Sequence, residues 1–126
     1  MIAMSSGMAK GEELATRITK FAGYIVEISA KLPPSIQGRH IAAQILRSGT
    51  ATAANYAEAR GAESRADFIH KLRIVQKELN ETEVWLGLIR QTQMISLEIT
   101  DQIVRENREL CKIIGASLRT LRSSPS

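Results

Sequence analysis

The sequence predicts an all-α fold, an antiparallel up-down-up-down four-helix bundle that spans residues 10–122. Apolar residues recur in steps of three and four along four long segments, which is the spacing of one helix face. Proline, glycine or a capping residue separates each segment from the next. No apolar run alternates with period two, so strands are not expected. Short links between long helices favour antiparallel neighbours.

The first helix is expected over residues 10–31, after a disordered segment of residues 1–9. Its core face is a heptad stripe: Leu14, Ile18, Phe21, Ile25, Ile28 and Leu32. Gly23 lowers helix propensity inside this segment, so we expect it to mark a close approach of a neighbouring helix. Pro33 and Pro34 then end the helix, since proline cannot continue it.

The second helix, over residues 35–60, is rich in alanine and poor in large apolar side chains. We expect it to lie close between its neighbours, because it buries little apolar area alone. Its expected core stripe is narrow and mostly small: Ile36, Ala43, Leu46, Thr50, Ala53 and Ala57. Gly61 suits a C-terminal cap.

The third helix is expected over residues 65–92, because Ser64 and Asp67 resemble a capping box at its start. Its core stripe is unbroken: Phe68, Leu72, Val75, Leu79, Thr82, Leu86 and Ile89. A second stripe runs beside it: Ile74, Glu81, Trp85 and Leu88. Two apolar stripes indicate two partners, the bundle interior and a neighbouring subunit.

The fourth helix is expected over residues 97–122, after an N-cap at Ser96 and before a tail of residues 123–126. Its core stripe is Ile99, Ile103, Leu110, Ile114 (or Ile113), Leu118 and Leu121. The same helix carries Lys112, Arg119 and Arg122 in a stretch without acidic residues. These cations either complement the helix C-terminus or form a basic patch for nucleic acid.

Composition argues against an enzyme, a cofactor or a membrane protein. The chain has 126 residues, a net charge of +4 and 4% aromatic residues, which suits one domain with an aliphatic core. The single Cys111 excludes an internal disulfide and is expected to pack in the core. Neither His40 nor His70 follows a glutamate by three positions, so a di-iron site is not expected. With no signal peptide or membrane span, we expect a cytoplasmic protein.

Polar residues on the second helix form the best candidate site. Arg47, Asn55 and Glu58 follow helical spacing and share one face. One interpretation is a network that fixes the register between helices, in which a buried Arg47 needs a carboxylate partner. The other is a contact for a ligand or nucleic acid.

The motifs of this stretch resemble those of a known family. The matching residues are Leu32-Pro33, Gln44, Arg47, Ser48, Asn55, Ala57, Glu58, Phe68, Leu72 and Glu81. The chain is therefore similar to the four-helix-bundle proteins encoded by intervening sequences in 23S ribosomal RNA genes. These are related to the accessory variability determinant proteins of diversity-generating retroelements. The resemblance covers roughly residues 14–120, but Ala59 and the pair Lys77-Glu78 replace the family's usual glycine and Gly-Ser.

The resemblance implies a homopentameric barrel and a polar network of Gln44, Arg47, Asn55 and Glu58. In the retroelement relatives, a basic surface works with reverse transcriptase and RNA or DNA. We therefore expect a non-enzymatic oligomeric scaffold that binds nucleic acid electrostatically. A protein-interaction platform without a nucleic-acid role is the alternative. A helix-turn-helix repressor is a poorer third interpretation, because the third helix starts with a mixed-charge face.

Overall fold

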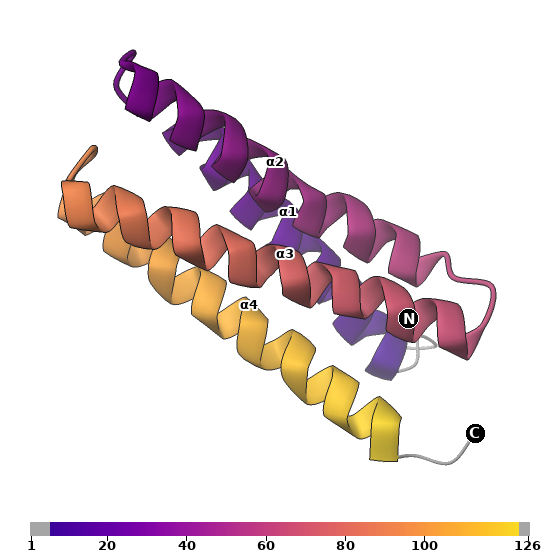
Figure 1. Cartoon of the computed structure of the whole chain (residues 1–126). Coiled ribbons are helices and arrows are strands. Elements are labelled where there is room, and N and C mark those ends of the chain that lie inside the picture. Colours follow the sequence, from indigo (N-terminus) through magenta and orange to yellow (C-terminus); the bar gives the residue numbers. More distant parts are fainter. Residues whose placement is uncertain (1–5, 124–126) are drawn as a thin grey trace.

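The computed structural model describes residues 6–123 and contains four helices and no strand within that range (Figure 1). The helices are α1 (Ser6–Lys31), α2 (Ile36–Arg60), α3 (Arg65–Thr92) and α4 (Leu97–Ser123). The all-α, four-helix prediction is confirmed. Helix α1 begins one turn before the expected start at residue 10, since no proline interrupts that turn. Residues 1–5 and 124–126, parts of the expected disordered segment and tail, lie outside the described residues.

Serine side chains cap the starts of three helices. The Oγ atoms of Ser35, Ser64 and Ser96 each accept a hydrogen bond from the backbone amide three residues later, at 3.0, 3.0 and 3.3 Å. Gly61 caps α2 with a φ of −94°, so it is not in the left-handed conformation. After α3, where the link has no glycine, the capping residue is Gln93. It adopts the left-handed conformation, with a φ of 52°.

Figure 1 shows how the chain passes back and forth along the molecule. The α1–α2 and α3–α4 links lie at one end, while the α2–α3 link, the start of α1 and the end of α4 lie at the other. Helix α3 contacts α2 and α4 extensively, and α2 also packs on α1. The contact between α1 and α4 is the smallest, although Arg17 bridges it by donating two hydrogen bonds to Glu106, both 2.7 Å long.

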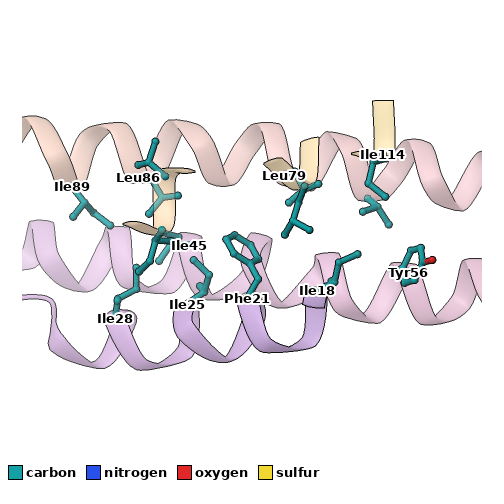
Figure 2. Close-up of a cluster of buried hydrophobic side chains, with 14 of the residues drawn as sticks. Ile18, Phe21, Ile25, Ile28, Ile45, Tyr56, Leu79, Leu86, Ile89 and Ile114 are labelled. Carbon is teal, nitrogen blue, oxygen red and sulfur yellow. The ribbon is translucent and has the colours of Figure 1, made fainter. Parts of the chain in front are cut away.

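The core lies along the predicted stripes of α1 and α3, and both predictions are confirmed. Figure 2 shows these side chains pointing toward one another between the helices. Every member of the two stripes is buried except Leu14 and Phe68, which are half-buried. Along α4, the predicted Ile103, Leu110, Ile114 and Leu118 are buried, while Ile99 is exposed at the start of the helix.

The predicted core face of α2 is wrong. Ile36 is 78% exposed and Leu46 is 39% exposed, whereas the buried face carries Gly38, Ile41, Ile45, Ser48, Gly49, Thr52, Tyr56 and Ala59. Two hydroxyls could be buried because each has a partner. The Ser48 Oγ lies 2.8 Å from the Thr82 Oγ1 of α3, and the Thr52 Oγ1 donates to the Gly49 carbonyl at 2.6 Å.

The close approach of helices lies at Gly49 rather than at Gly23. Gly23 is exposed, and a Cβ added there would have nothing within 4 Å, so the expectation for Gly23 is wrong. A Cβ added to Gly49 would lie 2.6 Å from Cγ2 of Ile25 on α1. Glycine at position 49 therefore sets the distance between α1 and α2.

Asn107 fills a gap in the predicted stripe of α4, between Ile103 and Leu110. It is fully buried, and its Nδ2 donates to the Leu79 carbonyl and to the Glu83 carboxylate, both at 3.0 Å. Its Oδ1 is buried with no hydrogen-bond partner in the described part of the chain. The buried Asn107 amide can make these two hydrogen bonds in only one alignment of α4 against α3. It therefore favours a single register between the two helices.

Candidate nucleic-acid interface and polar network

Arg47 is half-exposed and joins α2 to two carboxylates of α3. Its Nη1 lies 3.3 Å from the Glu78 Oε1, and its Nη2 donates to the Glu81 carboxylate. The Glu78 side chain is mostly buried, so this cation compensates a carboxylate removed from water. The hydrogen bond to Glu81 raises the pKa of Arg47, and the same bond lowers the pKa of Glu81 below its ordinary 4.5.

Two aromatic rings extend this contact along the outside of α2 and α3. The Trp85 Nε1 donates to the Glu81 Oε2 at 3.1 Å, which also helps to lower the pKa of Glu81. The ring of His40 stands edge-on to Trp85, with 6.0 Å between ring centroids and an angle of 82° between ring planes. Sequence reasoning missed this cluster, although the four-residue step from Glu81 to Trp85 was a signal for it.

The other three motif residues do not join Arg47. Asn55 donates through Nδ2 to the Ala51 carbonyl of its own helix at 2.9 Å. Glu58 accepts a hydrogen bond from the Lys71 Nζ of α3 at 2.6 Å. Gln44 is half-buried and makes no side-chain hydrogen bond within residues 6–123. Of these four residues, only Arg47 and Glu58 therefore make side-chain hydrogen bonds from α2 to α3, and the two contacts are separate. This arrangement favours the register interpretation over a ligand site.

The three predicted cations of α4 belong to a longer basic row. Lys112, Arg119 and Arg122 are exposed, and only Lys112 has a carboxylate near it, Glu109 at 3.4 Å. Such a surface ion pair contributes little stability, so Lys112 remains available to bind another anion. Arg105 and Arg108 extend the row toward the start of the helix. The five cations follow one another in steps of three, four, seven and three, which place them on one face. We call these five residues the basic row.

Sequence reasoning missed Arg105 and Arg108 because Glu106 and Glu109 interrupt that part of the helix. The structure turns Glu106 toward α1, where it binds Arg17. Arg108 binds Glu83 of α3 at 2.8 Å. Three arginines (Arg90, Arg105 and Arg108) line a depression of about 390 Å³ between α3 and α4 together with Asp101, which binds Arg90 at 2.7 Å. Within the described chain Arg105, Arg119 and Arg122 form no ion pair, so the row keeps a positive surface.

The described residues offer little else that could carry chemistry. Between residues 6 and 123, no three His, Cys, Asp or Glu side chains gather where a metal ion could bind. Cys111 is half-buried with its Sγ 3.6 Å from the Asn80 Oδ1, and burial raises the pKa of the thiol, which disfavours the reactive thiolate. No helix in this range has an apolar stretch that could cross a membrane.

Comparison with known proteins identifies the family. The family model described as 23S rRNA-intervening sequence protein matches residues 12–116. The chain belongs to this family. A crystal structure of another protein, of unknown function and from the S23 ribosomal protein family of Bacteroides thetaiotaomicron, has a similar fold, with a TM-score of 0.81. It is 38% identical in sequence, and the match covers 87% of this chain and 98% of that chain. No curated protein matches.

The family motif and the basic row lie on different parts of the fold. Of the polar motif residues on α2, Arg47 and Glu58 bind side chains of α3. The basic row is on α4, which α2 does not contact appreciably. In this member of the family, the residues that position α2 against α3 are therefore different from those that make the surface of α4 positive.

Proposed function

We propose that this protein is a non-enzymatic oligomeric scaffold that binds nucleic acid electrostatically through the basic row of α4. The observation that carries the proposal is the exposure of five cations on one helix face. From Arg105 to Arg122 the row extends about 25 Å, at 1.5 Å per residue. Successive phosphates of one duplex strand are about 3.4 Å apart along the axis, so the row matches several of them.

The composition of α4 also supports binding to the phosphate backbone rather than to bases. The helix contains no aromatic residue on which a base could stack. Arginine and lysine contacts to phosphates fix a position but carry no sequence information. Binding is therefore sequence-tolerant and weakens with salt.

The scaffold is a cytoplasmic homopentamer of up-down-up-down bundles. The family resemblance supports this assembly, and so do exposed apolar side chains on the outer faces of two helices. Ile36 and Leu46 of α2 and Val84 and Leu88 of α3 are all exposed in the single chain. Exposed apolar patches usually mark interfaces. Five copies of a chain with charge +4 carry +20, which strengthens attraction to phosphates.

Light scattering at micromolar concentration should return five chain masses. The double variant Leu46→Glu, Leu88→Glu should lower that mass while circular dichroism stays helical, because two buried carboxylates would disfavour the interface. Val26→Glu is the matched control, because Val26 is similarly exposed but lies on α1. A monomeric wild type would contradict the assembly.

Affinity for RNA or DNA should fall steeply as salt rises. Each neutralised phosphate contributes about −0.9 to the slope of log affinity against log salt concentration. Arg119→Gln with Arg122→Gln should therefore make the slope shallower by about two such contributions. The bundle should stay folded, since late-helix cations contribute only about 0.3–1 kcal/mol. Lys20→Gln with Lys31→Gln removes the same charge from α1 and should leave the slope unchanged.

A protein-interaction platform without nucleic acid is the second candidate. Tyr24 and Val26 on α1 are large apolar side chains with almost half of their surface exposed. A protein partner, such as the reverse transcriptase of the retroelement relatives, could cover them. This candidate replaces the first if the wild type binds no nucleic acid at about 50 mM salt, where phosphate binding is strong.

A further inference from the structure

A large hollow opens at the end of the bundle where α1 starts and α4 ends (Figure 1). Its volume is about 860 Å³, within the range of small-molecule sites. The start of α1, the end of α2, the start of α3 and the end of α4 surround it. Its floor is apolar and is formed by Leu14, Tyr56, Phe68, Ile113 and Leu121.

Cations dominate the rim of this hollow. Lys10, Arg17, Arg60 and Arg65 line it, against the single carboxylate of Glu13. Glu106 already binds Arg17, and Arg65 donates to the Leu121 carbonyl at the last turn of α4. Lys10 and Arg60 form no ion pair with any residue that the structure describes. The positive charge at the mouth is therefore uncompensated at these two residues.

Arg60 lines the hollow at a point where α1 has a glycine. Its guanidinium lies beside Gly11, where an added Cβ would be 3.5 Å from Nε and 3.7 Å from Cζ. The Tyr56 hydroxyl lies 3.5 Å from the carbonyl of the same Gly11, and burial raises the pKa of that tyrosine. The phenol thus stays protonated and neutral, so it does not cancel the charge of Arg60.

We propose that this hollow binds a small amphipathic anion of the fatty-acid class. The apolar floor takes the hydrocarbon tail, and Lys10 and Arg60 bind the carboxylate at the mouth. Charge complementarity selects this occupant, because a cationic amphiphile would meet the uncompensated charges of Lys10 and Arg60, and a nucleic acid has no apolar tail to bury. The lining of the hollow contains none of the five residues of the basic row, so this proposal can be tested independently of nucleic-acid binding.

Titration of the full chain with decanoate, with decylamine as the cationic comparison, tests this assignment. Decanoate should bind and shift the NMR methyl signals of Leu14, Ile113 and Leu121. Decylamine should bind at least about fivefold more weakly. Lys10→Gln with Arg60→Gln should weaken decanoate binding about fivefold to twentyfold, as expected for two partly exposed ion pairs. Lys20→Gln with Lys31→Gln, which removes equal charge elsewhere, should leave it unchanged.

A second variant tests the floor without changing charge. Leu121 is half-buried in the last turn of α4. Leu121→Asn should weaken decanoate binding, and the circular dichroism spectrum should remain helical. The proposal would be overturned if decanoate did not bind or if decylamine bound as tightly as decanoate. It would also be overturned if the Lys20→Gln, Lys31→Gln control lost as much affinity as the Lys10→Gln, Arg60→Gln variant. Methyl shifts that follow protein concentration alone would also overturn it, because a second copy of the chain would then occupy the hollow.

Discussion

Replacing Leu79 by alanine is expected to lower the free energy of unfolding by about 2–5 kcal/mol, the cost of deleting a buried leucine. Leu79 is fully buried on α3, which contacts both α2 and α4. The helices around it are held at fixed distances by Gly49 and Asn107, so the site cannot collapse freely. Leu72→Ala, two turns earlier and 1% exposed, should cost a similar amount.

Chemical denaturation followed by circular dichroism measures this loss. Val26→Ala is the control, because Val26 lies on α1 with 47% of its surface exposed. It should change stability by no more than about 0.5 kcal/mol. Losses below about 1 kcal/mol at both Leu72 and Leu79 would mean that the stripe of α3 does not form the core.

Replacing Gly49 by valine is expected to cost at least about 1–3 kcal/mol, as overpacking of a core does. A Cβ at this position would lie 2.6, 2.9 and 3.0 Å from three side-chain carbons of Ile25. Ile25 is fully buried and short, so it cannot move aside without displacing α1 from α2. Gly23→Val, at a glycine with open space around it, should stay within about 0.5 kcal/mol.

A double variant shows whether the loss comes from this contact. Ile25→Ala removes the side-chain carbons that the new valine would meet. The double variant Gly49→Val, Ile25→Ala should therefore be more stable than the sum of the two single losses predicts, by an interaction of about 0.5–3 kcal/mol. Additive losses in thermal and chemical denaturation would place the cause outside the α1–α2 contact.

Regular periodicity predicted all four helices and the core faces of α1 and α3. The stripes of α1 and α3 consist mostly of large apolar residues at heptad spacing. Such a face is buried in the interior, because exposing it to water would be unfavourable. The same reasoning failed for α2, where alanine makes two faces almost equally apolar. Burial of Ser48 and Thr52 depended on hydroxyl partners, one of them Thr82 on another helix.

The candidate sites were predictable only in part. The spacing of Lys112, Arg119 and Arg122 predicted a positive end to α4, and the structure places all three on its surface. Whether Arg105 and Arg108 join them depends on where Glu83 and Glu106 point, and that is decided by neighbouring helices. The partners of Arg47, which lie about thirty residues away on α3, were not predictable from helical spacing.

The sequence by itself determined the number of helices, their approximate ends and the faces that carry large aliphatic side chains. These features depend on proline, capping serines and local periodicity, all of which act within a few residues. Only the tertiary structure decided which face of α2 is buried, how closely α1 and α2 approach, and where the cationic hollow opens. Those features depend on contacts between residues distant in sequence, such as Gly49 with Ile25 and Arg60 with Gly11. Their energies exist only after the helices pack.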